Sequence, residues 1–92
     1  MTLSPEQREQ LRLSLLRFLD ANQTRYGLAV SLLLQMARNE GRPGLERDQV
    51  IGELLYLEDK HLIVETLKGV SPENPAFRIT AEGRDFVAMQ MS

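Results

Sequence analysis

The segment from Leu62 to Ile79 places the strongest constraint on the fold of this chain. Two short runs rich in β-branched and aromatic residues, 62–67 and 76–79, flank a stretch that holds two prolines and a glycine. This pattern predicts a hairpin of two antiparallel strands. Two short strands are not stable on their own in water. The hairpin must therefore lie against helices that the rest of the chain supplies.

The N-terminal part of the chain carries a strong helix start. Ser4-Pro5-Glu6-Gln7 combines a capping serine, a proline at the first helical position and a glutamine at the third. Behind it, apolar residues recur at helical spacing, namely Leu11, Leu15, Phe18 and Leu19. We therefore predict a helix from Pro5 to Ala21, preceded by disordered residues 1–3.

A second helix is predicted over residues 28–40, which are apolar on most faces and so indicate a largely buried element. The turn Gly41-Arg42-Pro43-Gly44 ends it. Residues 25–27, which come just before, form either a brief strand or a bend.

A third helix is expected from Glu46 to Lys60. Its apolar stripe holds Val50, Leu54 and Leu57, and Ile51 and Leu55 widen it. His61 follows as a C-terminal cap residue, where a left-handed backbone conformation is often needed. After the hairpin, Thr80 caps a last helix that runs from Ala81 to about Met89. All 92 residues thus form one α+β domain.

Two stretches carry a resemblance to a known superfamily. The recognition helix of bacterial winged-helix regulators, which runs directly into the wing, is resembled by Asp48-Gln49-Val50 together with Leu54-Leu55-Tyr56-Leu57-Glu58-Asp59-Lys60-His61-Leu62-Ile63. These regulators often have glycine at the position of His61. Phe77-Arg78-Ile79-Thr80-Ala81-Glu82-Gly83-Arg84 resembles their exit from the wing. From Leu11 to Val87 the chain is similar to the MarR, ArsR and PadR groups, and more similar still to small winged-helix proteins of Mu-like prophages.

The resemblance implies a winged helix-turn-helix fold, with a three-helix core, a two-stranded wing over about 62–79 and a C-terminal helix. It also implies a small DNA-binding protein, either a transcription regulator or a prophage accessory factor. In that class the third helix enters the major groove and the wing touches the DNA backbone.

Composition excludes several other functions. The chain has no cysteine and one histidine, so a thiolate metal site, an iron–sulfur cluster and a disulfide framework are ruled out. No serine stands in a nucleophile turn and no phosphate-binding loop is present. We therefore expect no enzymatic activity, no metal and no cofactor. No apolar run is long enough for a membrane span, and we expect a cytoplasmic protein.

The residues of the third helix that lie outside its apolar stripe are expected to form an outward face for DNA. They are Arg47, Gln49, Gly52, Glu53, Tyr56 and Lys60. Arginine pairs with guanine, glutamine with adenine, and tyrosine reaches phosphate. Further cationic contacts to the backbone are expected from Arg25, Arg38, Arg42, Lys68 and Arg78.

The charge of the third helix favours a different function. From Glu46 to Lys60 there are two basic and five acidic residues, a balance of −3, and the whole chain carries −2. Affinity for DNA comes largely from phosphate neutralisation by lysine and arginine. The alternative is a winged helix that binds a protein partner at its acidic third helix. A structural phage component is not separable from these two.

Two predictions concern the terminal helices. Arg8, Arg12 and Arg17 are expected on a solvated face of the first helix, in weak pairs with glutamates. Apolar residues on both terminal helices, Leu13, Phe86 and Met89, are expected at the interface of a homodimer.

Overall fold

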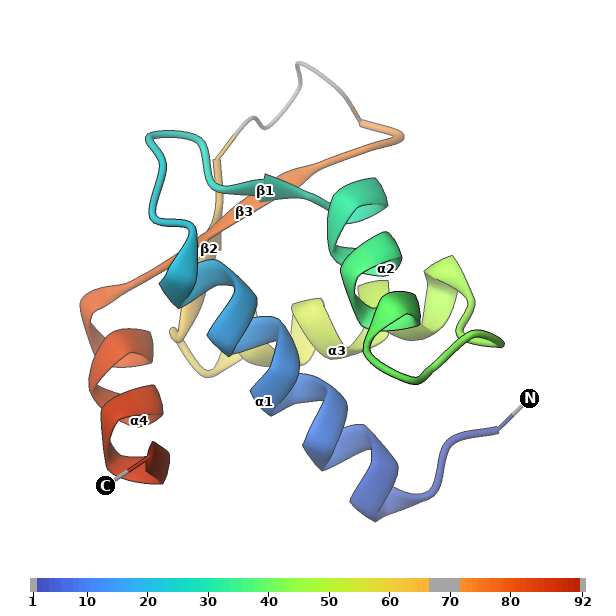
Figure 1. Ribbon diagram of the computed structural model, residues 1–92. Coiled ribbons are helices and arrows are strands. Elements are labelled where there is room, and N and C mark those ends of the chain that lie inside the picture. The colour runs from blue at the N-terminus through green and yellow to red at the C-terminus, as the bar shows by residue number, and fades with distance from the viewer. Residues whose placement is uncertain (1, 67–71, 92) are drawn as a thin grey trace.

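The described residues of the protein form an α+β domain of four helices and one three-stranded antiparallel sheet, as a computed structural model shows (Figure 1). The structure describes residues 2–66 and 72–91. Its elements are α1 (Pro5–Ala21), β1 (Leu28–Ala29), α2 (Val30–Asn39), α3 (Arg47–Asp59), β2 (Ile63–Glu65), β3 (Ala76–Ile79) and α4 (Ala81–Met91).

The sheet has the order β1-β3-β2, so the last strand of the chain lies in its middle. Leu28 pairs with Phe77 on one side of β3, and Ile63 pairs with Ile79 on the other. The chain enters β1 through Gly27, which has φ +71° and lies against β3 so closely that a Cβ there would stand 1.8 Å from the Phe77 carbonyl oxygen. Only glycine fits this approach.

The hydrophobic core lies where the sheet and the helices α2, α3 and α4 meet around α1 (Figure 1). Leucine supplies most of it. The fully buried leucines are Leu11, Leu15, Leu16, Leu19, Leu33, Leu45, Leu54 and Leu57. Leu3 also packs against this core, so the prediction of disorder over residues 1–3 is wrong at that position.

Several contacts hold the hairpin and α4 in place on the rest of the fold. The Asn74 side chain accepts a hydrogen bond from the Ser31 backbone N–H at 3.0 Å and thereby caps α2, whose own N-cap residue has no side-chain bond. The Glu58 carboxylate accepts the N–H of Glu65 at 3.2 Å. Gly83 brings α4 so close to the residue before β2 that a Cβ would stand 2.2 Å from the Leu62 carbonyl oxygen.

The local signals in the sequence are confirmed. Ser4 and Gln7 form the capping box of α1, which has the predicted bounds. His61 has φ 63°. The Thr80 hydroxyl accepts the N–H of Gly83 at 3.0 Å at the start of α4, and β3 has the predicted bounds as well.

Several boundaries differ from the predictions. Leu28 and Ala29 belong to a strand rather than to α2, because they pair with β3, and residues 25–26 form a turn. Helix α3 begins one residue later and ends one residue earlier than predicted, with Glu46 and Lys60 as its caps. Strand β2 covers only three residues, and α4 continues to Met91.

Candidate functional site

Helix α3 presents two faces of opposite character. Val50, Leu54 and Leu57 are buried against the core, as the apolar stripe predicts. Glu53 lies on the same face and is only 4% exposed. The prediction that Glu53 faces DNA is therefore wrong, because one helical turn separates it from both Val50 and Leu57.

Two arginines of α1 compensate the buried carboxylate of Glu53. Arg8 Nε donates to one carboxylate oxygen at 3.0 Å, and Arg12 Nε donates to the other at 2.7 Å. The Arg12 guanidinium also stacks on the Tyr56 ring, 3.8 Å from its centre. Arg8 and Arg12 thus belong to a contact between helices, not to the solvated face that the sequence predicts.

The side of α3 turned away from the core carries Asp48, Gly52, Leu55 and Asp59, all exposed, and we call it the α3 outer face. Leu55 is 49% exposed, so the prediction that it widens the core stripe is wrong. Spacings of four, three and four residues place these side chains in one row. Helical periodicity places this row opposite the buried residues Val50, Leu54 and Leu57, so the row could be derived from the sequence once those three residues were assigned to the core.

The hairpin extends this surface. Glu58 binds the backbone N–H of Glu65, and Arg47 Nη2 donates to the backbone carbonyl of Glu73. We call the α3 outer face with these four residues the α3–hairpin surface. Its carboxylates are Asp48, Glu58, Asp59, Glu65 and Glu73, and Arg47 is its one cation among residues 2–66 and 72–91.

Other residues predicted to contact DNA are engaged elsewhere. The Gln49 side-chain oxygen accepts the backbone N–H of Glu46 at 2.9 Å and closes the start of α3. Tyr56 lies beneath the Arg12 guanidinium, and Lys60 Nζ is 5.6 Å from the same ring. Tyr56 and Lys60 line a groove beside α1, away from Gly52.

The predicted backbone contacts are spread over the molecule. Arg38 Nε donates to the backbone carbonyl of Leu45 at 2.8 Å. Arg78 is exposed on β3, where it lines a shallow pocket with Thr24 and Arg84. Arg25 is exposed beside Tyr26, and Lys68 lies outside the described residues. Arg38, Arg25 and Arg78 thus belong to different segments of the described chain.

Arg42 belongs to a polar network between α1 and the end of α2. Glu40 forms ion pairs with Arg42 at 3.1 Å and with Arg17 at 3.5 Å. The buried Ser14 hydroxyl donates to the Glu40 carboxylate at 2.6 Å. That bond is the largest single cause that lowers the pKa of Glu40, desolvation opposes it, and Arg42 and Arg17 lower the pKa further.

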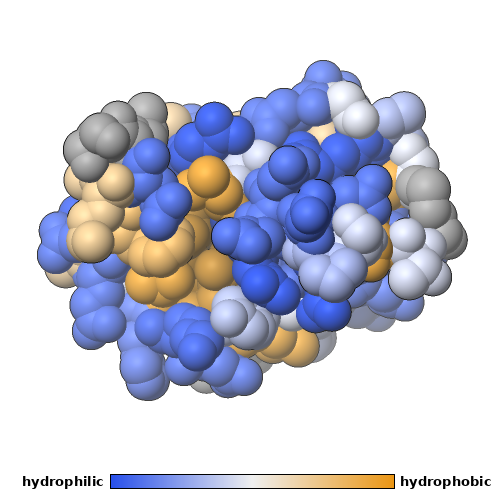
Figure 2. Space-filling view, turned by 90° about the horizontal axis from the view of Figure 1, so that it is seen from below, coloured by the Kyte–Doolittle hydropathy of each residue, from blue (hydrophilic) through white to orange (hydrophobic). Residues whose placement is uncertain are grey.

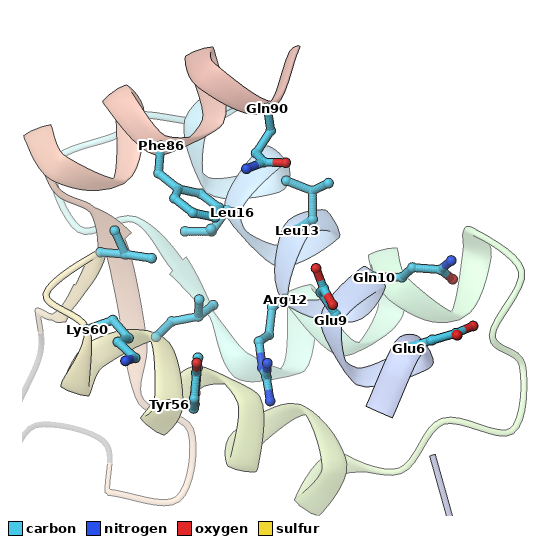
Figure 3. A pocket seen from close by; sticks show the side chains of 12 residues that line it. Glu6, Glu9, Gln10, Arg12, Leu13, Leu16, Tyr56, Lys60, Phe86 and Gln90 are labelled. Carbon is cyan, nitrogen blue, oxygen red and sulfur yellow. The ribbon is translucent and has the colours of Figure 1, made fainter. Parts of the chain in front are cut away.

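Two of the residues predicted at a dimer interface lie together. Leu13 and Phe86 line the same groove between α1 and α4 (Figure 3). Met89 is 75% exposed on α4.

No family model, curated protein or solved structure matches this chain. Within the described parts of the chain, no three histidine, aspartate or glutamate side chains are grouped as metal ligands. No helix there is long and apolar enough to span a membrane.

Proposed function

We propose that this chain is a winged-helix domain whose α3–hairpin surface binds a basic segment of a protein partner rather than DNA. The element order and the strand order β1-β3-β2 support the winged-helix assignment. In this interpretation α2 and α3 form the helix-turn-helix and β2 and β3 form the wing.

The charge of the α3–hairpin surface is the observation that carries the proposal. The described residues of this surface include five that are acidic and one arginine. Arg47 already donates to a backbone carbonyl and Glu58 already accepts a backbone N–H, so Asp48 and Asp59 carry most of the uncompensated charge. Asp48 and Asp59 form no ion pair with any described residue. A phosphate backbone is repelled by this surface, whereas lysine and arginine side chains of a partner are attracted to it.

Leu55 supplies an apolar contact at the centre of the row. It is half exposed between two aspartates, and Gly52 beside it has no atom within 4 Å of where a Cβ would stand. A partner backbone can therefore approach the helix closely at this point. The surface suits an amphipathic helix with one apolar stripe and basic flanks.

DNA binding is the second candidate function, and the fold favours it. The elements stand in the order found in the winged-helix regulators that the sequence resembles, and Arg47 lies at the N-terminal end of α3. With this charge distribution, any binding to duplex DNA must rely on a few separated arginines.

The proposal is tested with a fluorescent, helical model peptide made of leucine and lysine, titrated with the protein while anisotropy is recorded. We expect binding that weakens with salt, together with NMR shifts at the backbone amides of Gly52, Leu55 and Asp59. A mirror-charge peptide of leucine and glutamate should not bind.

Two matched variants locate the site. Leu55→Ser should weaken peptide binding by about tenfold or more, because it removes the apolar anchor of the surface without adding charge. Leu32→Ser is the control, since Leu32 is an equally exposed leucine on α2, 47% against 49%. Equal losses in both variants, or none in Leu55→Ser, would contradict the proposal.

A further inference from the structure

A pocket of about 380 Å³ opens where the turn after α1, the end of β3 and the start of α4 meet, at the left of Figure 1. Two arginines line it, Arg78 on β3 and Arg84 on α4. The remaining described residues of its lining are uncharged. The pocket therefore carries positive charge that no carboxylate of its own lining compensates.

The larger groove along α1 differs in this respect. Its volume is about 820 Å³, and Figure 3 shows Glu6 and Glu9 along it as well as Arg12 and Lys60, so both signs of charge are present. Seen from below in Figure 2, apolar residues gather in one place on the surface and hydrophilic residues surround them. Selection of a ligand by its charge is therefore expected in the pocket at Arg78 and Arg84 rather than in the groove.

The side chains of Arg78 and Arg84 are exposed and form no hydrogen bond or ion pair with any described residue. Every other described arginine or lysine engages a carboxylate, a backbone carbonyl or a tyrosine ring. Glu82 and Asp85 lie on the same helix as Arg84, but neither pairs with it. Two guanidinium groups in one pocket repel each other, and a bound anion removes this repulsion.

The other polar side chains of the pocket are already engaged. The Thr80 hydroxyl donates to the His61 carbonyl at 2.7 Å, and the Thr24 hydroxyl donates to the Gly27 carbonyl at 3.0 Å. The Gln23 amide donates to acceptors in the last turn of α1. These bonds fix the walls of the pocket and leave the two guanidinium groups as the side-chain donors for a ligand.

We propose that this pocket binds the phosphate group of a small phosphate monoester between Arg78 and Arg84. A carboxylate offers two oxygens in one plane and matches one guanidinium fork. A phosphate monoester offers three oxygens and about two negative charges, so it accepts hydrogen bonds from two forks on different elements and compensates both. The rest of the pocket leaves room for a small organic part beside Ile79.

The charge of the pocket favours a monoester over the backbone of a nucleic acid. Each phosphate of a nucleic acid is a diester with a single charge, which compensates one arginine of the pair. No residue of the α3–hairpin surface lines this pocket. The inference therefore concerns a separate site, and it can fail without the proposed function, as the proposed function can without it.

The test is a titration of the isotope-labelled protein with glycerol phosphate, followed by NMR at constant ionic strength. We expect saturable shifts at the backbone amides of Arg78, Thr80 and Arg84 and at the Nε–H signals of both arginines. Acetate at the same concentrations should shift these signals much less, because it matches a single fork.

Three variants locate the site. Arg78→Gln and Arg84→Gln should each raise the dissociation constant of glycerol phosphate by about tenfold or more, because each removes one charge-assisted fork. Arg25→Gln is the matched control and should leave the constant unchanged. Arg25 is an exposed arginine near the same turn, lies 5.3 Å from the Tyr26 ring and does not line the pocket. Circular dichroism checks that each variant is folded, which is expected because all three side chains are exposed.

A DNA duplex at equal phosphate concentration distinguishes the two sources of phosphate. We expect no shift at Arg84 with the duplex. A larger shift there with the duplex than with glycerol phosphate would overturn the proposal in favour of a nucleic acid backbone. The absence of a saturable shift with glycerol phosphate would also overturn it, as would equal binding by Arg25→Gln and by the double variant Arg78→Gln with Arg84→Gln.

Discussion

The carboxylates on the two faces of α3 differ in whether ion pairs compensate their charge. On the inner face Glu53 is buried and held by two arginines of α1, at 3.0 and 2.7 Å. On the outer face Asp48 and Asp59 flank a half-exposed leucine and form no ion pair with any described residue. The total charge of the helix therefore says little about its function. What matters is which carboxylates the fold has already compensated.

The adjacent residues Leu54 and Leu55 give the largest expected difference between the two faces. Leu54 is fully buried, so Leu54→Ala should lower the free energy of unfolding by about 2–5 kcal/mol. Leu55→Ala should change it by about 0.5 kcal/mol or less, since half of that side chain is already in water. Urea unfolding of both variants measures this. Comparable losses would show that the outer face is packed against something.

Removing one arginine partner of Glu53 should lower the free energy of unfolding, because the buried carboxylate is then less well compensated. Arg12→Ala leaves Glu53 with Arg8 alone, and we expect a loss of about 2–4 kcal/mol. The triple change Arg8→Ala, Arg12→Ala and Glu53→Leu should be less destabilising than Arg12→Ala, because no buried charge then remains. A triple variant less stable than the single one would mean that the ion pairs themselves hold α1 to α3.

Gly52→Ala should stabilise the fold while it weakens binding. A Cβ there meets no atom within 4 Å, and alanine is favoured over glycine inside a helix by about 1 kcal/mol. Thermal unfolding should thus shift upward. The peptide used above should bind more weakly to this variant, since the added methyl group stands in the way of a closely approaching partner. Stabilisation without loss of binding would remove Gly52 from the binding site.

The smallest expected effect is a pH dependence from Glu40. Its pKa lies below the ordinary value of 4.5 in the folded protein, so its contribution is present above pH 4.5 and is lost as pH falls through the folded pKa. Glu40→Gln should therefore be less stable than the natural protein at neutral pH, with a difference that shrinks in acid. Urea unfolding at several pH values follows this. A difference that is constant with pH would assign the effect to packing.

Structural features that depend on a few neighbouring residues could be predicted from the sequence. The capping box at Ser4, the left-handed residue His61 and the cap at Thr80 depend only on neighbours along the chain. The strand at Leu28 could not be predicted, because it exists only through pairing with Phe77.

The position of Glu53 on the core face follows from helical periodicity, since one turn separates it from both Val50 and Leu57. Its ion-pair partners could not be predicted, because Arg8 and Arg12 lie 45 and 41 residues earlier in the chain. The outer row from Asp48 to Asp59 could be predicted from helical periodicity, provided that only Val50, Leu54 and Leu57 were assigned to the core face and Leu55 was not. The predicted dimer residues Leu13 and Phe86 were identified from their place on terminal helices, and the groove that contains both comes from the packing of α4 on α1.

We infer that the α3–hairpin surface does not bind the phosphate backbone of DNA. The most direct test is the anisotropy of a labelled mixed-sequence duplex of about 30 base pairs, titrated with the protein from about 50 mM salt upward. We predict no binding at micromolar protein, and a gain of salt-sensitive binding in the variant Asp48→Arg with Asp59→Arg. Binding by the natural protein that falls steeply with salt and is lost in Arg47→Ala would contradict the claim and establish the DNA-binding function.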